Sequence, residues 1–162
     1  MHKIKLLICI IAGLVPLVST PLYSQSGKVP PFSMLQSGGK VFRAQDLPVG
    51  KPIVIIYFSP DCEECQALTS DLIRRADEFS RASVAMVTYL PVDYVTKFIS
   101  KYKLNYYPNI YVGTEGSSLF LKGYYNIEKF PVIALYTKSG DLVKMWKQED
   151  SLSEVSQLLK NL

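Results

Sequence analysis

Apolar runs alternate with amphipathic stretches from residue 53 to the end of the chain. Residues 53–58 are all apolar and mostly β-branched or aromatic, which is typical of a strand buried on both faces. Further apolar runs predict strands at 83–89, 109–112, 132–136 and 142–146. Apolar residues at helical spacing predict helices at 61–79, 92–102, 115–122 and 151–159.

Turn-forming residues occur before the first of these strands and between the last two. A Ser-Gly-Gly-Lys turn at 37–40 predicts a hairpin within 28–47, and 138–141 predicts a second hairpin. Strands that alternate with helices indicate a parallel core sheet, to which the closing hairpin adds an antiparallel edge. We therefore expect an α/β fold with a central mixed sheet, helices on both faces and an N-terminal β-hairpin extension.

The N-terminus has the layout of a secretory signal peptide. Basic residues up to Lys5 precede an apolar run of about ten residues, and small residues follow near 24–26. This pattern predicts a signal peptide at 1–26, cleaved near 24–26, and one domain at 27–162. An uncleaved membrane anchor is the alternative, although it needs roughly 20 apolar residues and prolines interrupt this run. Cys9 lies inside the run and is expected to be removed with it.

Composition excludes several kinds of function. The chain has 162 residues and a net charge of +4, without a long basic run or a glycine-rich phosphate loop, so nucleic acid is not an expected partner. His2 is the only histidine, and Cys62 and Cys65 are the only cysteines after the leader. A zinc site needs about four ligands, so we expect no metal and no other cofactor.

The candidate chemistry lies in the motif Cys62-Glu63-Glu64-Cys65, where a buried strand gives way to a helix. We expect Asp61 to be the N-cap, with Glu64 completing a capping box. Cys62 then faces the unpaired first-turn amides, which favour a thiolate. The negative charges of Glu63 and Glu64 destabilise that thiolate by about as much as the helix N-terminus stabilises it, and so tune the pKa of Cys62. A redox pair with Cys62 attacking and Cys65 resolving is the expected arrangement.

A structural disulfide between Cys62 and Cys65 is the competing interpretation, and it would make the chain a non-catalytic binding module. A bridge that spans only two residues adds little loop-closure stability, which argues against it. Peroxide reduction is also disfavoured, because the Pro-x-x-x-Thr-x-x-Cys pattern of that chemistry is absent.

The sequence resembles the thioredoxin superfamily in its strand at 53–58, its two-cysteine motif and the segment 129–132 before a strand and Gly-Asp turn. It is most similar to exported TlpA-type and ResA-type thiol–disulfide oxidoreductases, especially the secreted thioredoxin-like proteins of the Bacteroides group. The resemblance implies that Pro131 is the cis-proline opposite Cys62 and that the Phe130 backbone pairs with bound substrate; Pro108 is the competing proline. The family's buried acid maps to Ile56, which cannot move a proton.

These features together predict an extracytoplasmic protein-disulfide reductase or exchange enzyme. Its expected partners are disulfide-containing exported proteins and a membrane or periplasmic thiol that donates electrons. The expected location is periplasmic or secreted, with membrane attachment if the N-terminal segment is retained, and the expected state is a monomer.

Overall fold

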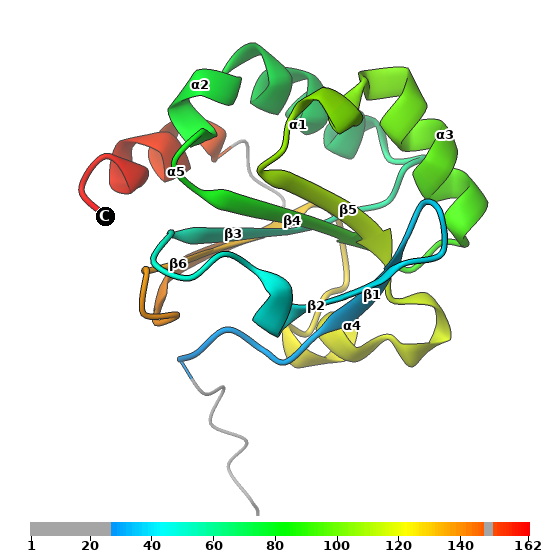
Figure 1. The fold of residues 1–162 in the computed structure, drawn as a ribbon, viewed down its shortest axis with the longest axis horizontal. Helices are drawn as coiled ribbons and strands as arrows, with labels where there is room; N and C mark the ends of the chain where they lie inside the picture. Colours follow the sequence, from blue (N-terminus) through cyan, green and yellow to red (C-terminus); the bar gives the residue numbers. More distant parts are fainter. Residues whose placement is uncertain (1–26, 148–150) are drawn as a thin grey trace, which may run out of the picture.

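The computed structural model describes residues 27–147 and 151–162, which fold around one seven-stranded sheet (Figure 1). The order across the sheet is β2-β1-β5-β4-β3-β6-β7. The strands are β1 (Ser33–Gln36), β2 (Val41–Arg43), β3 (Ile53–Tyr57), β4 (Ser83–Thr88), β5 (Ile110–Thr114), β6 (Val132–Tyr136) and β7 (Leu142–Lys147).

The sheet is mixed, as the alternation of elements predicts. β3, β4 and β5 run parallel to one another. On each side of them the outer strands pair antiparallel with their neighbours: β6 with β3 and β7 with β6, and β1 with β5 and β2 with β1. β3 lies inside the sheet between β4 and β6, and Tyr57 at its end lies opposite Val132. The carboxyl ends of β3, β4 and β5 therefore meet at one edge of the sheet.

Helices cover both faces, but unequally. In Figure 1, α1 (Glu63–Arg74), α2 (Ala76–Phe79), α3 (Val92–Tyr102) and α5 (Leu152–Leu159) lie on one face, and α4 (Phe120–Tyr124) lies on the other. Short 3₁₀ turns occur at Ala44–Asp46, Leu104–Tyr106 and Gly116–Ser118. The fold class is the one that the sequence predicts.

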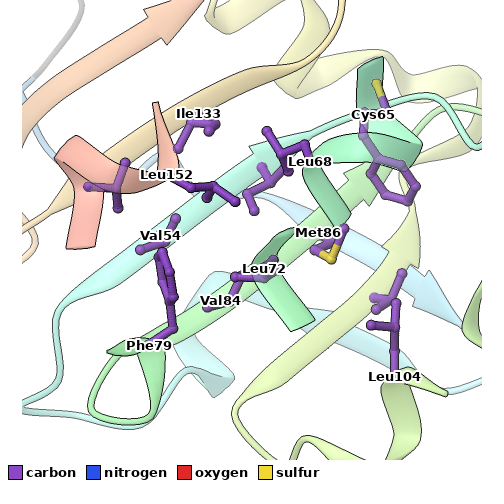
Figure 2. Packing of buried hydrophobic residues seen from close by; sticks show 14 of the residues in the cluster. Val54, Cys65, Leu68, Leu72, Phe79, Val84, Met86, Leu104, Ile133 and Leu152 are labelled. Atoms are coloured by element: carbon purple, nitrogen blue, oxygen red, sulfur yellow. The ribbon is translucent and has the colours of Figure 1, made fainter. Parts of the chain in front are cut away.

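The strict alternation of side chains along β3 divides the core into two clusters. Val54 and Ile56 pack with residues of α1, α2, α3 and α5 in the first cluster, part of which is shown in Figure 2. Ile55 and Tyr57 pack in the second cluster, with residues of β1, β2 and α4. We call these the helical cluster and the hairpin cluster.

Two predicted helices have different bounds in the structure. The helix expected to continue to Phe79 stops at Arg74, because Arg75 leaves helical geometry, and α2 begins at Ala76. The helix expected at 115–122 is a 3₁₀ turn followed by α4. Leu119 adopts a left-handed conformation there, with φ of 47°, and interrupts the helix.

The predicted signal peptide at 1–26 lies outside the described residues. Within 27–147 and 151–162, no helix is both long enough and apolar enough to cross a membrane.

Candidate active site

The loop from β3 to α1 folds so that Cys62, and not Asp61, is the N-cap of the helix. The Cys62 amide donates to the Ser59 carbonyl at 3.1 Å, which forms a tight turn at the end of the strand. The hydroxyl of Ser59 donates to Asp61, so the carboxylate of Asp61 is held by the turn instead of by the helix. The predicted Asp61 cap and its capping box with Glu64 are therefore wrong by one residue.

This shift places the Cys62 sulfur directly at the helix end. Cys62 Sγ accepts a hydrogen bond from the Cys65 amide at 3.3 Å, so the sulfur takes the capping position itself. An amide donor and the helix dipole both stabilise negative charge at that point. Thiolate stabilisation, inferred from the sequence for the first helical residue, is provided here at the N-cap.

The two sulfurs are adjacent and differ in exposure. The Cys65 thiol donates to Cys62 Sγ across 2.8 Å, and both cysteines are free thiols. Cys62 is half-buried, while Cys65 is completely buried in the helical cluster (Figure 2). An accessible thiol beside a shielded one is the arrangement needed for attack by the first and resolution by the second.

Burial controls the protonation of Cys65. Desolvation raises the pKa of its thiol well above the ordinary value of 9.0, and the hydrogen bond to Cys62 adds to the increase. Cys65 therefore stays protonated near neutral pH and donates to the Cys62 sulfur.

The two acids of the motif are placed differently from one another. Glu64 Oε2 accepts from the Cys62 thiol at 3.3 Å, and within the described residues Glu64, not Glu63, bonds that sulfur. The pKa of Glu64 is lowered, first by a hydrogen bond with its own backbone and then by Cys62. Both acids are exposed, so solvent screens their effect on Cys62.

Phe130 and Pro131 approach the site from β6. The Phe130–Pro131 peptide bond is cis, and it is the cis bond found among the described residues, so Pro108 is not the cis-proline. Tyr57 pairs with Val132, and continuing this antiparallel register brings Phe130 to the level of Ser59. The tertiary structure thus brings Phe130 and Pro131 to the strand end from which Cys62 projects.

An aromatic and acidic group that the sequence pattern does not predict lies next to Phe130. The ring of Phe130 stacks with Tyr57 and with Tyr89, at centroid distances of 5.9 and 5.7 Å. Glu115, which is 8% exposed, accepts a hydrogen bond from the Tyr57 hydroxyl at 2.6 Å. Nothing in local spacing indicates this group, because Tyr57 and Glu115 are far apart in the chain and meet only when β5 lies beside β4.

Ile56 is completely buried on the helical side of β3. The position of the family's buried acid is therefore apolar, and proton transfer to or from Cys65 needs another route. Within the described residues no group of His, Cys, Asp and Glu side chains is arranged to hold a metal ion.

Comparison with known proteins identifies the family. The model of the AhpC/TSA family matches residues 26–109, which is just over half of the 162 residues. The chain belongs to the AhpC/TSA family. Its family and the pair of thiols at the start of α1 together identify the protein as a thiol–disulfide oxidoreductase. Comparison with curated protein sequences yields no match.

Solved structures share the thioredoxin-like fold. A secreted disulfide oxidoreductase of Mycobacterium tuberculosis superposes with a TM-score of 0.65 at 21% identity, covering 82% of this chain and 96% of that chain. A thiol–disulfide oxidoreductase of Bacteroides fragilis gives 0.66 at 15% identity, covering 83% and 99%. An exposed lipoprotein thioredoxin of Streptococcus pneumoniae gives 0.60 at 26% identity, covering 82% and 100%.

Proposed function

We propose that this protein reduces or exchanges disulfides of exported proteins outside the cytoplasm, with Cys62 as the attacking thiol and Cys65 as the resolving thiol. The observation that carries the proposal is the pair of free sulfurs 2.8 Å apart at the N-terminus of α1, one accessible and one buried. A disulfide bond of ~2.05 Å is reached from this distance by a small movement of either side chain.

The reaction begins when the Cys62 thiol loses its proton. Solvent takes this proton, because the lowered pKa of Glu64 makes that carboxylate a weak base. The Cys62 thiolate attacks one sulfur of the substrate disulfide, so that a Cys62–substrate bond forms and the substrate S–S bond breaks. The departing substrate thiolate is protonated by solvent.

Resolution depends on Cys65. Its thiol loses a proton and attacks Cys62 Sγ, which forms the Cys62–Cys65 disulfide and releases the second substrate thiol. Two electrons have then moved from the protein dithiol to the substrate. Because burial raises the pKa of Cys65 and Ile56 offers no proton acceptor, we expect this second step to be slow at neutral pH.

A reductase must be reduced again after each cycle, so the proposal includes a membrane or periplasmic thiol protein as electron donor. The proposed location follows from the signal-peptide pattern at 1–26, with the domain at 27–162 released or retained near the membrane. The B. fragilis and M. tuberculosis neighbours are described as thiol–disulfide and secreted disulfide oxidoreductases, which supports the proposed class of reaction. N-terminal sequencing of the exported protein tests this part: a start at residue 25 or 27 supports cleavage, and a start at Met1 supports an anchor.

The deciding experiment is the equilibrium reduction potential of the Cys62–Cys65 pair, titrated against a glutathione or dithiothreitol buffer and followed by thiol labelling. A value between about −200 and −290 mV, with rapid labelling of Cys62, is the expected result for an exchange-active pair. A potential below about −300 mV with slow labelling identifies a structural bridge and a binding module instead. Cys62→Ser is the control, because it cannot form the bridge and its labelling must not depend on the buffer.

A further inference from the structure

A buried carboxylate lies next to the aromatic group that contacts Phe130. Glu115 follows β5, and its side chain accepts hydrogen bonds from three donors, which belong to Tyr57, Leu121 and Lys122. Oε1 accepts from the Tyr57 hydroxyl at 2.6 Å and from the Lys122 amide at 3.3 Å, while Oε2 accepts from the Leu121 amide at 2.7 Å. A buried polar group with its donors satisfied holds one orientation, because every alternative leaves a donor unpaired.

These contacts join β3 to the first turn of α4. Tyr57 belongs to β3, and its ring stacks on the ring of Phe130. Leu121 and Lys122 lie in the first turn of α4, which is followed by the segment that leads to Phe130. Glu115 therefore ties Tyr57, on whose ring Phe130 stacks, to the first turn of α4.

Phe130 is half-buried and packs against both core clusters. Its other ring neighbour is Tyr89, and the Lys122 ammonium lies 5.3 Å from the centre of the Tyr89 ring. Ring stacking and a cation over an aromatic face are weak interactions, and by themselves they do not fix the orientation of a loop residue. The hydrogen bond between Tyr57 and Glu115 fixes the Tyr57 ring, on which Phe130 stacks.

We propose that the Tyr57 hydroxyl and the Glu115 carboxylate are positioning groups that hold Phe130 ready to bind polypeptide substrates beside Cys62. The inference rests on the proposed function, in which the Phe130 backbone pairs with the substrate chain. A disulfide within a polypeptide uses that pairing, whereas a small aromatic disulfide needs only the Cys62 sulfur. The two groups therefore set the preference for polypeptide over small disulfides.

The test is Tyr57→Phe, which keeps the stacked ring and removes only the hydroxyl. The matched control is Tyr136→Phe, which also removes one buried hydroxyl from the hairpin cluster. The Tyr136 hydroxyl pairs with that of Tyr125 at 2.6 Å, and the Tyr136 side chain is as deeply buried as that of Tyr57. Steady-state reduction of insulin, with dithiothreitol as electron donor, measures KM and kcat. The rate of reaction with the small disulfide 5,5′-dithiobis(2-nitrobenzoate) measures Cys62 alone.

We expect Y57F to raise KM for insulin about fivefold, the size of effect from losing one hydrogen bond, with kcat and the small-disulfide rate within about twofold of wild type. Y136F is expected to leave all three values unchanged. E115Q is expected to raise KM by a smaller factor than Y57F, because its amide group can pair with the Tyr57 oxygen and its carbonyl with the Leu121 amide, while the Lys122 amide loses its acceptor.

Two results overturn the inference: an unchanged KM in Y57F, or an equal rise in Y57F and Y136F, which marks a general loss of stability. If the wild-type protein does not reduce insulin, the reduction potential still decides the proposed function, and positioning is read from NMR. Y57F, but not Y136F, must then shift the ring resonances of Phe130 and Tyr89. Unshifted Phe130 resonances in Y57F refute the positioning role independently of turnover.

Discussion

On one face of β3, Val54 and Ile56 lie in a cluster of apolar side chains that also contains Cys65; on the other face, Ile55 and Tyr57 lie beside hydroxyl groups and a carboxylate. The helical cluster shields a thiol from water and raises its pKa. The hairpin cluster contains the Tyr57–Glu115 and Tyr125–Tyr136 hydrogen bonds, which restrict how its side chains turn. One strand thus separates an apolar environment, suited to tuning a thiol, from a hydrogen-bonded one, suited to fixing a position.

The difference shows why both clusters are needed at one site. Apolar packing fills space but permits small rotations, whereas a buried hydrogen bond has a preferred direction. Phe130 packs against both clusters, so the substrate-binding position that we propose for it would depend on each. The following predictions test whether chemistry and positioning separate as this comparison implies.

The largest expected effect comes from removing the attacking sulfur. Cys62→Ser should reduce turnover of disulfide substrates by more than about 10³-fold, because serine does not replace a thiolate nucleophile. Cys65→Ser should still attack but remain as a mixed disulfide, which intact-protein mass spectrometry detects as an adduct on Cys62. Steady turnover by C65S at the wild-type rate would contradict the resolving role of Cys65.

A matched pair of cavity variants compares the two faces directly. Ile56→Ala and Ile55→Ala remove the same atoms from side chains that are 0% and 1% exposed, so each should lower the free energy of unfolding by about 2–5 kcal/mol. Fluorescence of Trp146, the single tryptophan, follows unfolding in urea. Only I56A should also speed native-state alkylation of Cys65, since its cavity opens in the helical cluster. Equal alkylation rates in the two variants would show that the faces do not differ in this way.

The smallest expected effect is on stability at alkaline pH. The pKa of Cys65 in the folded, reduced protein is raised above its ordinary 9.0, so its contribution is complete below pH 9 and is lost as pH rises. Reduced wild-type protein should therefore lose up to about 1 kcal/mol of unfolding free energy per pH unit between about pH 9 and 10.5 beyond any loss in C65S. Urea unfolding of both proteins across that range measures the difference. The buried tyrosines titrate in both proteins and cancel, so parallel curves would rule out a raised Cys65 pKa.

The sequence predicted most of the fold because its signals are local. The unbroken apolar run of β3, the helical spacing of α3 and the turn before β7 each occur within a short window, and the structure has all three elements. Helix ends were less predictable. The N-cap lies at Cys62 instead of Asp61 because Ser59 bonds Asp61, and the first helix ends at Arg74 because the backbone of Arg75 leaves helical geometry.

The residue pattern by itself determined that two cysteines stand where a buried strand meets a helix, and that no histidine accompanies them. Only the tertiary structure decided which thiol is shielded, that Glu64 and not Glu63 reaches the Cys62 sulfur, and that Tyr57, Tyr89, Glu115 and Phe130 share one site. The physical reason is distance along the chain. Spacing and propensity act over a few residues, whereas burial and the Glu115 hydrogen bonds arise when β3, β4, β5 and β6 are brought side by side in the sheet.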